Sequence, residues 1–64
     1  MINCYVFEDD NIGIIGVMAK TEVEAITMLE NNTDISSNPI LLDCIPEDDK
    51  LFDEMLDSYG CDVL

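Results

Sequence analysis

The chain has 64 residues, of which 48% are hydrophobic, and it carries fifteen acidic residues against two lysines, with a formal net charge of -13 and no histidine. A chain this short forms one domain, here residues 1–64, near the lower limit at which a hydrophobic core alone gives independent stability. Two cations cannot neutralise a phosphate backbone or an anionic lipid surface, so the composition excludes direct nucleic-acid and membrane binding and favours a basic protein partner.

The cysteines and the N-terminus indicate a cytoplasmic protein. Cys4, Cys44 and Cys61 are odd in number and have no Cys-x-x-Cys spacing, which is typical of a reducing compartment. Cys4 and Cys44 lie in apolar runs and are predicted to be small core residues. No basic segment precedes an apolar one at the N-terminus, and no apolar run is long enough to span a bilayer.

The first half of the chain predicts a hairpin followed by a helix. Side chains alternate over residues 2–7, turn-forming residues follow at 8–11, and residues 12–19 form a second strand that is apolar on both sides. Such a strand is covered on both faces or keeps one face for a partner. Thr21 and Glu24 form a capping box, and Asn31 and Asn32 end the predicted helix. Its predicted apolar face consists of Val23, Ala25, Ile26, Met28 and Leu29.

The second half predicts a loop over residues 33–39, a third strand over 40–45 and a final helix from Pro46 to Tyr59 with Gly60 as its stop. Residues 61–64 form a tail that either docks or frays. The predicted fold is α+β, in the order strand-strand-helix-strand-helix, with a three-stranded sheet packed by two helices. A crossover through the first helix leaves the third strand parallel to the second, whereas its neighbour in the sheet stays open.

The final predicted helix has one apolar and one acidic face. Its apolar stripe consists of Leu51, Phe52, Met55, Leu56 and Tyr59. On the other side, acidic residues recur every four positions with rungs about 6 Å apart. Like charges at this spacing each cost a helix roughly 0.2–0.5 kcal/mol, so the ladder predicts a binding role. The predicted partner-binding residues are Glu47, Asp48, Asp49, Asp53, Glu54 and Asp57, with Glu8, Asp9 and Asp10 as a secondary set.

No catalytic residue, metal site or cofactor is predicted. The serines have no histidine to act as base, and adjacent carboxylates are expected by chance among fifteen acidic residues. The spacing of Asp9, Asn11 and Gly13 resembles the start of a calcium loop but lacks the required register and the closing Glu. Three cysteines without histidine do not complete an ordinary zinc site, and Gly13 and Gly16 lack the Lys-Ser/Thr of a phosphate loop.

With the ladder of Asp49, Asp53 and Asp57, its acidic neighbours, its small size and its scarcity of basic residues, the chain resembles the small acidic inhibitors that phages encode against host defences. This class includes anti-CRISPR proteins and DNA-mimic inhibitors. The resemblance is in general character over all 64 residues. It implies a protein without catalysis of its own that occupies the nucleic-acid groove of a nuclease, such as a CRISPR effector, in the cytoplasm of a bacterial host.

Three alternatives remain open at this point. The acidic face could serve solubility alone, because excess acid is a common route to it. A structural or regulatory subunit, including a homodimer, would assemble through apolar sheet surface at residues 12–19, Tyr5 and Phe7. An acid-rich calcium binder would be stabilised by millimolar calcium.

Overall fold

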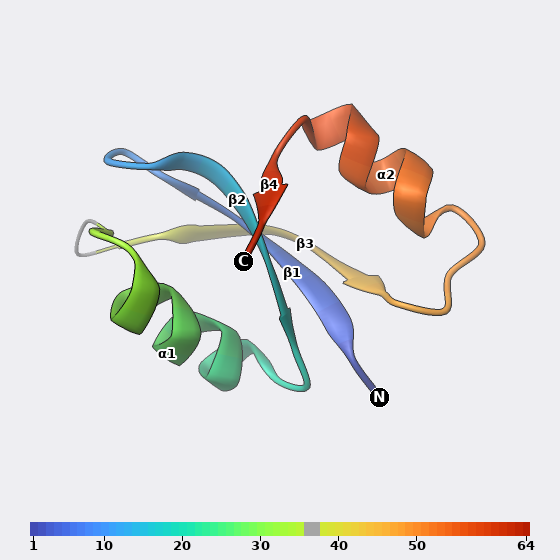
Figure 1. Cartoon of the computed structure of the whole chain (residues 1–64), viewed down its shortest axis with the longest axis horizontal. Coiled ribbons are helices and arrows are strands. Elements are labelled where there is room, and N and C mark those ends of the chain that lie inside the picture. The colour runs from blue at the N-terminus through green and yellow to red at the C-terminus, as the bar shows by residue number, and fades with distance from the viewer. Residues whose placement is uncertain (36–37) are drawn as a thin grey trace.

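The computed structural model describes residues 1–35 and 38–64, in which a four-stranded sheet lies between two helices (Figure 1). In chain order the elements are β1 (Asn3–Asp9), β2 (Gly13–Ala19), α1 (Glu22–Asn32), β3 (Ile40–Pro46), α2 (Phe52–Tyr59) and β4 (Asp62–Val63). The strand order is β3-β1-β2-β4. The α+β class with two helices is confirmed, but the prediction of three strands is wrong. Ser36 and Ser37, in the predicted loop 33–39, lie outside the described residues.

The predicted hairpin is confirmed. β1 pairs antiparallel with β2 in an unbroken register from Asn3 opposite Ala19 to Asp9 opposite Gly13. The N–H of Asn11 donates to Asp9 Oδ2 at 3.0 Å, a local side-chain contact that fixes the turn. Gly13 has a φ of 77°, a left-handed conformation that glycine adopts without a steric penalty.

The two faces of β2 are covered to different degrees. One face of the hairpin buries Tyr5, Phe7 and Val17 against Ala25 and Leu29 of α1. The other face buries Cys4 and Val6 with Ile45 of β3, under half-buried side chains of α2. Ile14 and Met18 of β2 also lie on this second face and are only half-buried, so the predicted cover of residues 12–19 on both sides is partial. Because Tyr5 and Phe7 are buried, the apolar sheet surface invoked for a structural subunit is absent there.

The capping box of α1 is confirmed, with one difference in its partners. The N–H of Glu24 donates to Thr21 Oγ1 at 3.1 Å, while Glu24 Oε2 accepts from the N–H of Lys20 at 3.2 Å, one residue before the cap. At the other end, Thr33 donates to the Leu29 carbonyl at 2.7 Å through its hydroxyl. Val23, predicted on the apolar face, is 74% exposed because it lies two residues before the buried Ala25, about 200° around the helix and so on its outward side.

β3 lies next to β1 and antiparallel to it, which makes it parallel to β2 as predicted. The ladder contains a β-bulge, because Val6 pairs with Asp43 whereas Phe7 pairs with Leu41, so that Leu42 is the extra residue. Cys44 is exposed, and its prediction as a core residue is wrong. Cys44 lies opposite Tyr5, on the sheet face that α1 covers, but α1 packs over β2 and not over this part of β3, whereas Ile45 on the other face is buried under α2.

α2 begins at Phe52, six residues later than predicted. Pro46 is the last residue of β3, and the chain continues alongside β1 because the N–H of Glu47 donates to the Ile2 carbonyl at 3.1 Å. A turn follows, in which Asp49 Oδ1 accepts from the N–H of Leu51 at 2.8 Å. Leu51 therefore precedes the helix and is 52% exposed, so it does not belong to the apolar stripe. Gly60 ends the helix with a φ of 62°, as predicted.

The C-terminal residues form β4, where the sequence predicted only a tail. β4 pairs parallel with β2, and the N–H of Leu64 donates to the Gly16 carbonyl at 2.7 Å. A Cβ at Gly16 would lie 2.9 Å from Cys4 Sγ and 3.5 Å from Val63 Cγ2, so this position requires glycine for space. The tail orders because β2 would otherwise present an open edge.

Candidate partner-binding surface

The outward side of α2 carries three exposed carboxylates, from Asp53, Glu54 and Asp57. Asp53 and Asp57 are four residues apart on a regular helix, so their side chains lie on one side of it, about 6 Å apart along the axis. The helix Phe52–Tyr59 contains no lysine or arginine. Of the predicted ladder of Asp49, Asp53 and Asp57, only Asp53 and Asp57 lie on α2.

The acidic residues before α2 occupy a turn. Glu47, Asp48 and Asp49 are exposed, yet they lie outside the helix, so helical spacing does not apply to them. The carboxylate of Asp49 already accepts the N–H of Leu51, which holds the turn in shape. Asp49 thus orients the start of α2, and Asp53 and Asp57 carry the regular spacing.

α2 is attached to the sheet by half-buried side chains and one side-chain hydrogen bond. Phe52, Met55, Leu56 and Tyr59 pack on the core of Cys4, Val6 and Ile45, although none of them is fully buried. The hydroxyl of Tyr59 donates to Asp43 Oδ2 at 3.0 Å, and this hydrogen bond raises the pKa of the phenol. Asp43 therefore links α2 to β3.

Asp43 was not predicted as a functional or structural residue. Its other oxygen, Oδ1, accepts the N–H of the next residue, Cys44, at 2.8 Å. The sequence did contain a signal, because Asp43 is the single polar side chain in an otherwise apolar strand. A polar residue at such a position needs hydrogen-bond partners, and here both carboxylate oxygens have one.

Of the secondary partner-binding residues predicted at the hairpin turn, only Glu8 and Asp10 are available to a partner. Both are exposed, whereas Asp9 is only 3% exposed and accepts from the N–H of Asn11. Asp9 is a structural residue of the turn. The hairpin turn and α2 lie on opposite sides of the view in Figure 1, so the two acidic sets do not form one continuous surface there.

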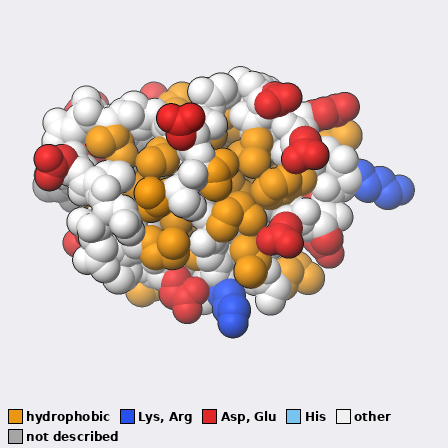
Figure 2. Space-filling view, in the orientation of Figure 1, with side chains coloured by type: hydrophobic (Ala, Val, Ile, Leu, Met, Phe, Trp, Pro, Cys, Tyr) orange, Lys and Arg blue, Asp and Glu red, His pale blue; other side chains and the backbone are white. Residues whose placement is uncertain are grey.

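Acidic side chains lie around the periphery of one face of the molecule (Figure 2). On the face seen in Figure 2, acidic side chains are spread around the periphery of an apolar centre. With a formal net charge of -13, the long-range potential of the protein is negative overall, and α2 supplies the regularly spaced part of it.

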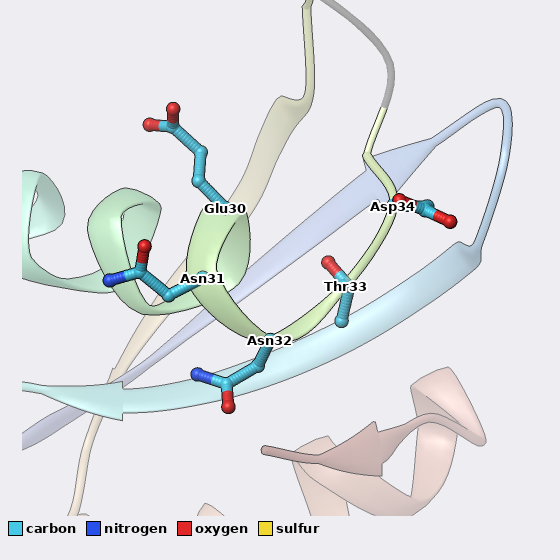
Figure 3. Close-up of a pocket in the computed structure, with 5 residues that line it drawn as sticks. All are labelled: Glu30, Asn31, Asn32, Thr33 and Asp34. Atoms are coloured by element: carbon cyan, nitrogen blue, oxygen red, sulfur yellow. The ribbon is translucent and has the colours of Figure 1, made fainter.

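Figure 3 shows an open pocket that is formed by the C-terminal end of α1 and the residues just after it. Its side chains point away from one another, and the Asn32 amide donates to the Met28 carbonyl at 2.8 Å. It is lined by Glu30, Asn31, Asn32, Thr33 and Asp34. Within residues 1–35 and 38–64, no group of three or more His, Cys, Asp or Glu side chains is placed to hold a metal ion.

The three cysteines are free thiols with different environments. Cys4 is buried, Cys61 is half-buried and Cys44 is exposed. Burial raises the pKa of the Cys4 thiol, with a further contribution from Cys61, so Cys4 stays protonated and packs as a small apolar group.

Comparison with protein families, curated proteins and solved structures finds no match to this chain. None of the helices in the described part of the chain is both long and apolar enough to cross a membrane.

Proposed function

We propose that this protein binds a basic nucleic-acid-binding protein and inhibits it by occupying its nucleic-acid groove. The target class is a nuclease, such as a CRISPR effector, in the cytoplasm of a bacterial host. One observation carries the proposal: α2 exposes Asp53, Glu54 and Asp57 without a single cation, while its other side is attached to the sheet. The protein acts by occupancy and performs no chemistry.

The physical basis is the attraction between regularly spaced carboxylates and the Arg and Lys side chains of a nucleic-acid groove. Arg and Lys bind carboxylates and phosphates with the same kind of charge-assisted hydrogen bond. The hydrogen bond from Tyr59 to Asp43 and the packing of Phe52 keep α2 in one position, which lowers the entropic cost of binding. The net charge of -13 steers the encounter with a basic surface.

The direct test is competition at stoichiometric amounts. A purified, guide-loaded CRISPR nuclease is equilibrated with a fluorescent target duplex, and the protein is titrated into the mixture while anisotropy is recorded. Displacement that saturates near one equivalent and weakens steeply with salt supports the proposal. A panel of such nucleases and other basic nucleic-acid-binding proteins that all keep their duplex would contradict it.

Two matched double variants test whether α2 is the contact. Asp53→Lys with Asp57→Lys changes α2, and Glu22→Lys with Glu30→Lys changes exposed positions of α1 on the opposite side of the sheet. Each reversal adds two charge units, so both proteins go from -13 to -9. We expect the α2 variant to lose competition and the α1 variant to keep most of it. Equal loss in both would mean that total charge, not α2, decides binding.

A further inference from the structure

The outer edge of β3 is the longest open sheet edge in the described part of the chain. The opposite edge of the sheet ends in β4, which has two residues, whereas β3 has seven. Three consecutive apolar side chains on β3 are exposed, with Ile40 at 59%, Leu41 at 36% and Leu42 at 39%. An open edge with apolar side chains is the kind of surface that pairs with an extended segment of another chain.

The second half of this edge is blocked. In an antiparallel ladder, alternate residues direct their backbone groups to the same side. The N–H of Glu47 donates to the Ile2 carbonyl, so the backbone groups of Glu47 point toward the neighbouring chain segment. By the same alternation, the backbone N–H and C=O groups of Cys44 and Pro46 point outward, to the open edge. The N–H of Cys44 is taken by Asp43 Oδ1, and proline has no N–H. Neither position can donate to a partner strand.

The first half of the edge is open. Past the bulge at Leu42, Leu41 lies opposite Phe7, whose backbone groups point to β2 by the same alternation. The N–H and C=O of Leu41 therefore point outward from the open edge of the sheet, between the exposed side chains of Ile40 and Leu42. This is the geometry that a short extended segment needs for a pair of main-chain hydrogen bonds and two apolar contacts.

The charge around this edge selects its occupant. Glu8, which lies opposite Ile40 at the start of β3, is exposed, and Glu47 is exposed just past its end. A second copy of this chain would bring another -13 charge to a contact only three residues long, far smaller than a stable dimer needs. A segment with apolar residues between Lys or Arg residues complements both the edge and its rim.

We propose that the edge Ile40, Leu41 and Leu42 receives an extended, lysine- or arginine-flanked apolar segment of the basic partner. The identity of the partner as a basic protein rests on the proposed function, whereas the edge geometry is independent of it. Main-chain pairing at Leu41 adds a component of affinity that salt screens little, next to the salt-sensitive contribution of α2.

The test uses a peptide of alternating lysine and valine with blocked ends, and a second peptide with serine in place of valine. Amide chemical shifts and hydrogen exchange of the whole protein are followed by NMR during titration. The valine peptide should shift and protect the Leu41 amide, and it should still do so at about 0.5 M salt, where charges are screened within a few Å. The serine peptide, with equal charge, should not.

Three variants test the edge itself. Leu41→Pro removes the outward N–H without removing a bond to β1, and it should weaken the valine peptide about tenfold. Leu41→Ala keeps that N–H and should weaken binding less. Leu42→Lys keeps every backbone donor and repels the peptide, which covers the case in which the proline variant does not fold.

Three results would overturn the inference: shifts confined to α2, unchanged affinity in both Leu41→Pro and Leu42→Lys, or a dimer of the protein alone that Leu41→Pro dissociates. None of them bears on competition with nucleic acid by Asp53 and Asp57. The edge inference and the proposed function can therefore fail separately.

Discussion

The two helices of this protein differ in what they give to the fold. α1 places Ala25 and Leu29 fully inside the core and begins with the side-chain cap of Thr21. α2 has no fully buried residue, and Leu51 at its start provides no side-chain cap. The difference separates two roles: α1 stabilises the sheet, while α2 displays carboxylates at some cost to its own stability.

The cost on α2 is offset by contacts outside the helix. An isolated helix of eight residues is far below the length that is stable in water. Gly60 closes its C-terminus, Tyr59 bonds Asp43, and β4 holds the chain that follows against β2. α2 therefore depends on tertiary contacts more than α1 does.

The largest expected difference comes from truncating one leucine on each helix. Leu29→Ala empties a fully buried site of α1 and should cost about 2–5 kcal/mol, most or all of the stability of so small a domain. Leu56→Ala on α2 removes a half-buried side chain and should cost less than half as much. Urea unfolding followed by circular dichroism measures both. Equal losses would show that α2 contributes to the core as strongly as α1.

The two helix starts provide the second comparison. Thr21→Ala removes the oxygen that accepts from Glu24 and should cost about 1 kcal/mol. Leu51→Ala should change stability by less than about 0.5 kcal/mol, because its side chain is exposed and caps nothing. Thermal unfolding of the two variants at the same pH gives the comparison. A larger loss of stability in Leu51→Ala would mean that the Leu51 side chain packs against the rest of the protein in solution.

Neutralising one acid on α2 should stabilise the protein slightly. Asp57 lies in the last turn, where the helix dipole disfavours a negative charge, and four residues after Asp53. Asp57→Asn should therefore gain roughly 0.2–0.5 kcal/mol at low salt and less at high salt. Glu24→Ala on α1 should do the opposite, because it removes the contact with the Lys20 N–H. Urea midpoints measured at two salt concentrations give the expected gain in Asp57→Asn and the expected loss in Glu24→Ala. A stabilised Asp57→Asn that has also lost partner binding would mean that the charge is kept for function.

The smallest effect is expected from Tyr59 at high pH. The hydrogen bond to Asp43 raises the pKa of the phenol in the folded state. Its stabilising contribution is complete below the ordinary tyrosine pKa of about 10 and is lost as pH rises through the higher folded value. Tyr59→Phe should remove the phenolate absorbance that develops above the ordinary tyrosine pKa through Tyr59, and with it this alkaline loss of stability. A phenolate component lost in Tyr59→Phe that titrates at the ordinary tyrosine pKa would show that Tyr59 and Asp43 do not pair in solution.

The candidate site was predictable where it depended on neighbours in sequence. The four-residue spacing of Asp53 and Asp57 on an amphipathic segment was enough to predict an exposed acidic face. The burial of Asp9 was not predictable, because Glu8, Asp9 and Asp10 look alike in the sequence and only the hairpin turn separates their environments. The pairing of Tyr59 with Asp43 spans sixteen residues and needed the sheet to bring them together.

The sequence alone determined the hairpin of β1 and β2, the start of α1 at Thr21 and the end of α2 at Gly60, because each depends on interactions within a few residues. Only the tertiary structure decided the rest. α2 starts at Phe52 because Glu47 pairs with Ile2 and Asp49 turns the chain. Cys44 is exposed because α1 covers β2 and not the same face of β3, and β4 forms because β2 offers it a free edge. Strand order follows from which faces and edges remain to be covered, a property of the folded chain and not of any local pattern.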